Sequence, residues 1–232
     1  MNKDEEDMAR GFYGYGHWEA PYWFIGPEQG MGRHEGDISR RVRAWQDLGK
    51  RDLNDCREFH RHIDEMRFHF KEPVALQSTW RRLILLLMSF QGGKLTGDKL
   101  KDREILRAYQ RDRWGVRDKK LGETCVIELS GLAAPSLKES KETGQHLQER
   151  IRYIRNNIRD NRSTLRLIVM YGKGQKNSWD QIAGKVFPPG PESFLIDGLM
   201  ILAFTPHPNA RGLTDQCWEK LGKTLRKESN RL

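Results

Sequence analysis

The sequence predicts a three-layer α/β/α fold around a central sheet of four parallel strands. Four short runs are predominantly apolar, as strands are when both faces of a sheet are covered. Helical patterns separate these runs, and that alternation is typical of parallel strands joined by crossover helices. The expected strands are residues 22–26, 124–129, 165–171 and 199–204.

Each expected strand runs into a loop of unusual composition. The loops read Gly-Pro-Glu-Gln-Gly-Met-Gly, Ser-Gly-Leu-Ala-Ala-Pro, Tyr-Gly-Lys-Gly and Thr-Pro-His-Pro-Asn-Ala-Arg-Gly. Ligands of open α/β sheets bind outside the carboxyl ends of the strands. We therefore expect these four loops to gather at one edge of the sheet and to form the functional site there.

Helices are expected between and after the strands. Apolar residues recur at helical spacing from Asp37 to about Phe70, and Gly49-Lys50 divides this segment into two helices. A final helix is expected from Thr214 to about Lys227. Further helices are expected over residues 81–90, 99–113, 140–160 and 179–184.

The chain is expected to form one domain over residues 20–232, preceded by a flexible N-terminal arm over residues 1–19. The N-terminus begins with charged residues and lacks the apolar stretch of a signal peptide. The longest apolar run, residues 83–88, is too short to span a bilayer. We expect a cytoplasmic, nucleoid-associated protein that is monomeric and makes no membrane contact.

The charge balance favours a polyanionic partner. Lys and Arg number 41 against 32 Asp and Glu, which gives a net charge of +9. Phosphate contacts by such residues release counterions, so nucleic acid is the expected partner, and a merely soluble basic surface is the alternative. The three cysteines, Cys56, Cys125 and Cys217, are far apart, which argues against a disulfide framework, a zinc site or an iron–sulfur cluster. No cofactor is expected.

Two turns carry candidate catalytic groups. Glu28 stands in the turn from Gly26 to Gly30, where glycines allow a ligand to approach the backbone; the alternative is a tight turn with a solvated carboxylate. His207 is flanked by Pro206 and Pro208, and prolines on both sides hold it rigidly, as a catalytic donor requires.

Two basic residues near these turns are candidates for phosphate contacts. Lys173 lies between Gly172 and Gly174, and an ordinary basic turn is the alternative interpretation. Arg211 follows His207 closely, where it would reach a phosphate or fill a gap in a base stack.

One helical face invites a metal-site interpretation. Glu58, His62, Glu65 and His69 are spaced by four, three and four residues and therefore share a face. No second helix offers a matching set of ligands, so we expect a solvated face and no metal.

The two turns together resemble the uracil-DNA glycosylase superfamily. Its members carry Gly-x-(Asp/Asn/Ala)-Pro-(Gly/Tyr) after the first core strand and His-Pro-(Ser/Asn/Ala) after the last. Here the corresponding segments are Gly26-Pro27-Glu28-Gln29-Gly30 and His207-Pro208-Asn209. Glu28 stands where the family usually has Asp or Asn, and Gln29 replaces its Pro. The strand ending in Gly172 and the strand before Ser130 look like two further core strands of the family.

This resemblance implies a uracil-DNA glycosylase-like fold and hydrolysis of the N-glycosidic bond of a flipped-out base, in base excision repair. It implies Glu28 and His207 as the catalytic pair. It further implies base contacts by Gly26, Pro27, Gln29, Ser130 and Asn209, DNA contacts by Arg33, Lys173 and Arg211, and a stacking aromatic among Trp45, Tyr22 and Phe24. The alternatives are a nucleic-acid-binding protein with little or no activity, and a nucleoside or nucleotide hydrolase.

Overall fold

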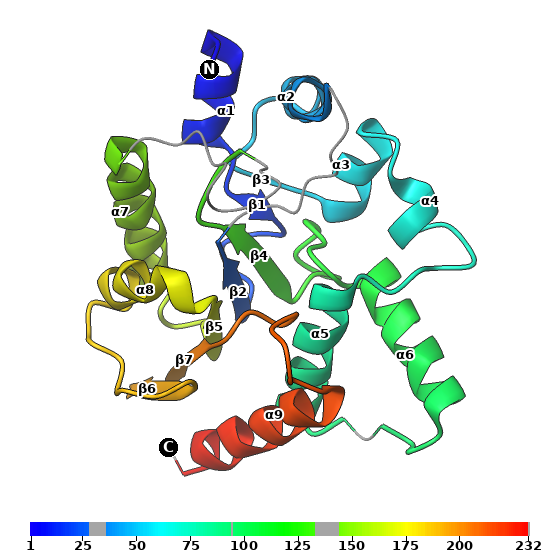
Figure 1. Cartoon of the computed structure of the whole chain (residues 1–232), viewed down its shortest axis with the longest axis vertical. Coiled ribbons are helices and arrows are strands. Elements are labelled where there is room, and N and C mark those ends of the chain that lie inside the picture. The colour runs from blue at the N-terminus through cyan, green and yellow to red at the C-terminus, as the bar shows by residue number, and fades with distance from the viewer. Residues whose placement is uncertain (28–35, 94, 133–143, 232) are drawn as a thin grey trace.

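The structure is built on one mixed β-sheet. The computed structural model describes residues 1–27, 36–93, 95–132 and 144–231. Within these residues seven strands form a sheet in the order β3-β1-β4-β2-β5-β7-β6. Helices lie on both faces of this sheet, and the chain has an α/β fold (Figure 1).

The centre of the sheet consists of the four strands that the sequence predicts. They are β4 (Thr124–Glu128), β2 (Tyr22–Gly26), β5 (Leu167–Tyr171) and β7 (Met200–Thr205). All neighbouring pairs among them are parallel. Their carboxyl ends therefore lie at one edge, as expected.

The expectation of only four strands, all parallel, is wrong. Strand β1 (Gly14–Tyr15) runs antiparallel to β4, and β3 (Leu53–Asn54) is parallel to β1. At the other end of the sheet β6 (Ser193–Asp197) runs antiparallel to β7. Strands of two residues are too short to give any periodic signal in a sequence. Strand β6 is a partly exposed edge strand, so it lacks the predominantly apolar run that marks the central four.

From residue 37 onward, the helices follow the predicted pattern with one exception. The segment from Asp37 to Phe70 contains three helices, not two, and β3 separates the first from the second. None of the helices in the described part of the chain has the length and apolar character needed to cross a membrane. The helices that follow β2 in the chain are α2 (Asp37–Asp47), α3 (Cys56–His62), α4 (Met66–His69), α5 (Ser78–Gln91), α6 (Lys99–Asp112), α7 (Gly144–Asp160), α8 (Lys176–Ala183) and α9 (Asp215–Ser229), with a 3-10 turn η2 (Lys173–Gln175) before α8.

Each face of the sheet has its own hydrophobic core. Side chains alternate along a strand, so Trp23 and Phe24 of β2 point to opposite faces. Trp23 belongs to the core that includes Ile154 of α7 and Trp179 of α8. Phe24 belongs to the core that includes Leu83 of α5 and Trp218 of α9. Figure 1 shows α7 and α8 on one side of the sheet and α5, α6 and α9 on the other.

The expectation of a loose arm over residues 1–19 is wrong for its larger part. Helix α1 (Lys3–Gly11) begins with a capping box, in which Asn2 and Glu5 satisfy each other's backbone N–H groups. Its inner face carries Met8 and Ala9, both buried, and the chain continues through buried Phe12 into β1. The acids of the first turn face solvent and favour the helix N-terminus, and the apolar side chains beneath them join the core.

Candidate functional site

The loops after the four parallel strands are joined by backbone hydrogen bonds at the carboxyl edge of the sheet. Leu129 N–H donates to the Gly26 carbonyl over 2.8 Å, and Ser130 N–H donates to the Pro27 carbonyl over 2.9 Å. These bonds connect the loops after β4 and β2. Gly172 N–H donates to the Thr205 carbonyl over 3.0 Å and connects the loops after β5 and β7.

Tyr171, the last residue of β5, fits the first turn against its neighbour. Its phenol ring lies so close to Gly26 that a Cβ atom there would overlap the ring. A Cβ atom on Gly172 would be 3.7 Å from Cγ of Pro27, so these two loops are also in contact. The close approach of the Tyr171 side chain therefore requires glycine at position 26, whether or not a ligand also approaches the backbone there.

His207 also packs against Tyr171. Their ring centroids are 5.6 Å apart, and the ring planes meet at 71°. The backbone N–H of Asn209 donates to Nδ1 of His207 over 3.1 Å. A neutral imidazole with Nδ1 as acceptor carries its proton on Nε2, so this ring offers an N–H donor. Tyr171 thus links the Gly26 turn to the His207 turn.

The surroundings of His207 favour the neutral ring. Burial lowers the pKa of His207 below its ordinary value, and the positive charge of Arg82 lowers it further. At pH 7 the imidazole is therefore uncharged. It is able to donate a hydrogen bond from Nε2 to a developing negative charge.

Two residues expected to contact a base are hydrogen-bonded to other residues of the chain. The side-chain amide of Asn209 donates to Oγ of Ser78 and Oγ1 of Thr79, both over 2.9 Å. The hydroxyl of Ser130 is buried and donates to the Leu132 carbonyl over 2.8 Å. Asn209 thus connects the His207 turn to the start of α5, and Ser130 stabilises its own turn.

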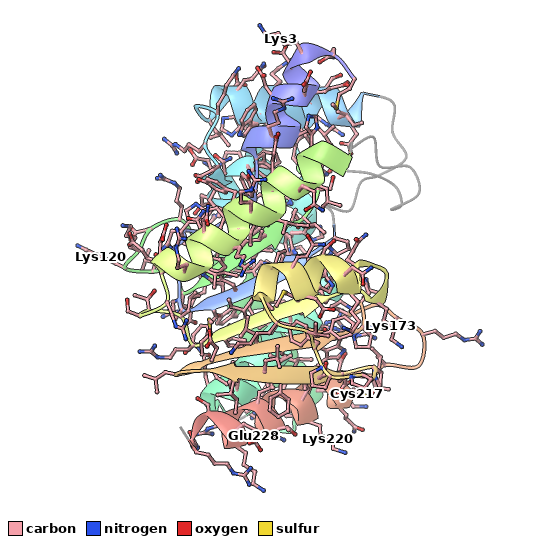
Figure 2. The ribbon with its side chains drawn as sticks, turned by 90° about the vertical axis from the view of Figure 1, so that its left-hand side faces the viewer. Lys3, Lys120, Lys173, Cys217, Lys220 and Glu228 are labelled. Atoms are coloured by element: carbon pink, nitrogen blue, oxygen red, sulfur yellow. The ribbon has the colours of Figure 1, made fainter. Side chains whose placement is uncertain are left out.

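The predicted DNA contacts lie at the same edge where the structure describes them. Lys173 is exposed and directly follows Gly172, and Arg211 is exposed in the turn after β7. Figure 2 shows Lys173 and Lys120 at opposite ends of the strands. Glu28, Gln29 and Arg33 lie outside the described residues.

Sequence reasoning missed Glu128 and Tyr171. Glu128 is the last residue of β4, pairs in register with Gly26 and is buried. Burial raises the pKa of Tyr171 well above its ordinary value, and the charge of Glu128 raises it further. The available signal was an acid within the apolar run Thr-Cys-Val-Ile-Glu-Leu, because charged residues are seldom buried without a specific reason.

The described residues contain no cluster of three or more His, Cys, Asp or Glu side chains suited to a metal ion. His62 Nδ1 lies 3.0 Å from the Glu58 carbonyl of its own helix. His69 packs against Trp80, with ring centroids 5.3 Å apart, and Glu65 accepts a bond from Arg41 over 3.3 Å. Glu58 and His62 lie on α3, His69 lies on α4 and Glu65 lies between these helices, so the expectation that the four residues share one helical face is wrong.

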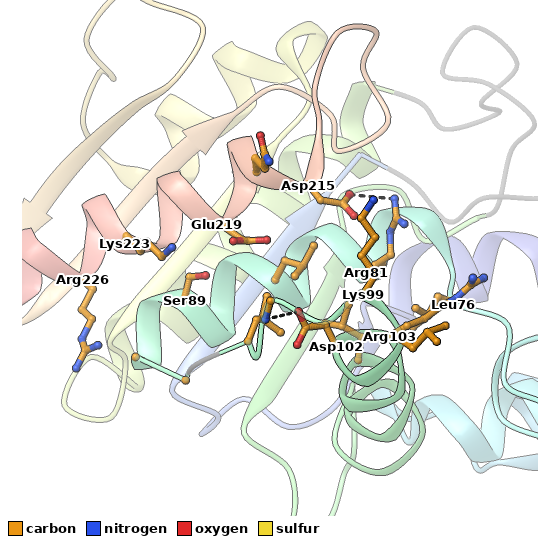
Figure 3. Close-up of a pocket in the computed structure, with 18 of the residues that line it drawn as sticks. Leu76, Arg81, Ser89, Lys99, Asp102, Arg103, Asp215, Glu219, Lys223 and Arg226 are labelled. Atoms are coloured by element: carbon orange, nitrogen blue, oxygen red, sulfur yellow. Dashed lines mark hydrogen bonds and ion pairs between the residues drawn. The ribbon is translucent and has the colours of Figure 1, made fainter.

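A groove of about 1120 Å³ lies apart from this edge, between α5, α6 and α9 (Figure 3). Leu85 and Leu106 form part of its wall, and Lys223 and Arg226 are among its cationic side chains. Among the residues that the structure describes, its lining includes none from the four strand-end loops. It reaches Arg81 and Asp215, and Asp215 also pairs with Arg82, which donates to the Pro208 carbonyl.

Comparison of the chain with protein-family models, with curated proteins and with solved structures finds no match.

Proposed function

We propose that this chain is a monomeric DNA glycosylase with a uracil-DNA glycosylase-like fold, which hydrolyses the N-glycosidic bond of uracil or another deaminated base. The observation that carries the proposal is the convergence of two distant turns. The Gly26–Pro27 turn and the His207 turn both contact Tyr171 at the carboxyl edge of the sheet. These are the two turns on which the family resemblance depends.

The proposed mechanism assigns one charge of the transition state to each turn. The departing base gains negative charge, which the Nε2–H group of neutral His207 stabilises by donating a hydrogen bond. The sugar gains positive charge, which a carboxylate stabilises, and the same carboxylate orients the attacking water. We assign this role to Glu28, which directly follows Pro27 in the sequence. Glu128 supplies a second carboxylate at the same edge.

DNA binding is assigned to cations around these turns. Lys173 and Arg211 are exposed beside the site, and Arg33 follows Glu28 in the sequence. Flipping a base out of the duplex costs a few kcal/mol, which phosphate contacts and pocket contacts offset. The net charge of +9 favours such contacts.

The test is base release from end-labelled strands that carry uracil, hypoxanthine or xanthine, followed by alkaline cleavage. We expect Glu28→Gln and His207→Ala each to slow release on the order of 10²-fold. Glu58→Gln serves as the matched control, because Glu58 lies near Arg117 and Asp118, which precede β4 at the opposite edge. Unchanged rates in both site variants would reject the assignment.

The same assay separates the alternatives. Tight binding of uracil-containing or abasic DNA without base release would favour a binding protein. Release of bases from free nucleosides, with no affinity for DNA, would identify a nucleoside hydrolase.

A further inference from the structure

The start of α5 forms hydrogen bonds with the turn that carries His207. Ser78 and Thr79, the first two residues of the helix, accept the two bonds from the Asn209 amide. Arg82, one turn further along, donates from Nη1 to the Pro208 carbonyl. Pro208 and Asn209, which directly follow His207, are thereby tied to one helix.

Asp215, the first residue of α9, forms ion pairs with Arg82 and with the neighbouring Arg81. Nη2 of Arg81 lies 2.9 Å from Oδ1 of Asp215, and Nε of Arg82 lies 3.5 Å from the same oxygen. Figure 3 shows Arg81 and Asp215 directed toward each other. The Arg82 side chain is only 17% exposed, so water screens its charge weakly.

Among the described residues, the groups that face His207 come from three elements. Tyr171 of β5 contributes a neutral ring, since burial keeps its pKa high. Arg82 of α5 contributes a positive charge that disfavours a second charge on the imidazole. Asp215 of α9 lies behind Arg82 and offsets part of that charge.

We propose that Arg82 is a positioning residue for His207: it fixes the turn through the Pro208 carbonyl and presents a cation to the imidazole, and Asp215 modulates that cation. The value of this arrangement for catalysis rests on the proposed function, because a neutral donor is what a departing base anion requires. Arg82 touches neither base nor sugar in this scheme. It acts only through His207.

The test is an NMR titration of the histidine Cε1–H resonances in the whole protein, with the His207 signal identified by its loss in His207→Gln. We expect Arg82→Gln to raise the pKa of His207 toward the ordinary value. Asp215→Asn should lower it further, because the charge of Arg82 is then less compensated. Arg82→Lys should keep the pKa low, since it keeps the charge.

Arg81→Gln is the matched control, because Arg81 shares the Asp215 carboxylate but makes no bond to the His207 turn. It should move the pKa of His207 less than Arg82→Gln does. In base-release assays, Arg82→Gln and Arg82→Lys should both slow the reaction about tenfold through misplacement of the turn. Only Arg82→Gln should also shift the acidic limb of the pH profile to higher pH.

An unchanged His207 titration in Arg82→Gln would overturn the proposal. Shifts of the His207 pKa in the same direction in Arg82→Gln and Asp215→Asn would also overturn it. General loosening of the turn would move the pKa in the same direction in both variants, whereas the proposal requires opposite directions. The titration needs no activity. Absence of base release by the unmodified protein would therefore reject the glycosylase function and leave the role of Arg82 to be decided by NMR.

Discussion

The phenol ring of Tyr171 lies directly over Gly26, and the same ring meets His207 edge-on at a centroid distance of 5.6 Å. One aromatic side chain thus connects the first and last loops of the site. The loop after β2 owes its position to a residue that ends β5. A side chain at position 26 would overlap the same ring that packs against the imidazole.

Gly26→Ala should lower the free energy of unfolding by about 1–3 kcal/mol, because the new methyl group displaces the buried ring of Tyr171. Urea unfolding measures this cost. In a Tyr171→Leu background the same substitution should cost much less, since the overlapping ring is absent. Equal costs in both backgrounds would show that Tyr171 does not set the requirement for glycine.

Lys173→Ala and Arg211→Ala should each weaken DNA binding for all sequences alike. If each residue contacts one phosphate, the slope of log K against log salt concentration should fall by about 1 per substitution. Binding titrations at several salt concentrations measure both effects. Lys120→Ala is the control at the opposite edge and should leave the slope unchanged. A similar loss in all three variants would indicate only a diffuse effect of net charge.

Arg150→Met should destabilise the protein by about 3–5 kcal/mol. The Arg150 side chain is fully buried and donates to the carbonyls of Leu129, Ala9 and Glu128 over 2.7, 2.8 and 2.7 Å. Methionine fills similar space and leaves these carbonyls without that donor. Arg159→Met on the same helix, at a side chain 74% exposed, should change the free energy of unfolding by no more than about 0.5 kcal/mol. Comparable values for the two variants would contradict this role of Arg150.

The protein should lose stability in acid through His60. Burial lowers the pKa of His60 to about 3, against an unfolded value of about 6.5. Between these values the unfolded chain binds a proton that the folded chain lacks, so stability falls as the pH falls through this window. The slope contributed by this group is at most about 1.4 kcal/mol per pH unit.

Urea unfolding at pH 7 and pH 4.5 checks this prediction. His60→Gln keeps a polar side chain near the Cys56 carbonyl, which lies 2.7 Å from His60 Nδ1, and removes the titration. The variant should lose less stability than the unmodified protein over the same interval. An equal loss would assign the acid sensitivity to other groups.

The central strands could be predicted from the sequence because both of their faces are covered, which makes Trp23 and Phe24 apolar alike. Strands β1 and β3 could not be predicted, since each depends on pairing with residues far away in the chain. Helix α1 carries a readable capping box at Asn2 and Glu5, but the surrounding acids concealed its buried face. Local patterns thus revealed elements that are regular along their own length.

Within the site, glycines and prolines marked the turns that contain Gly26 and His207 because those residue types restrict the backbone locally. Tyr171 carried no such mark, although it joins the two turns. Arg82 lies 126 positions before Pro208, to whose carbonyl it donates, and no spacing in the sequence predicts such a contact. The groups that orient a site come from distant segments, so only the folded arrangement reveals them.

The bond between Arg150 and the Ala9 carbonyl spans 141 positions of the chain. During synthesis Ala9 leaves the ribosome long before Arg150 does. The Ala9 carbonyl of the first helix is therefore exposed before the guanidinium that donates to it has been made. Docking of that helix completes only after α7 has been synthesised. The amino-terminal helix, although made first, therefore lacks this hydrogen bond until the chain has been synthesised as far as α7.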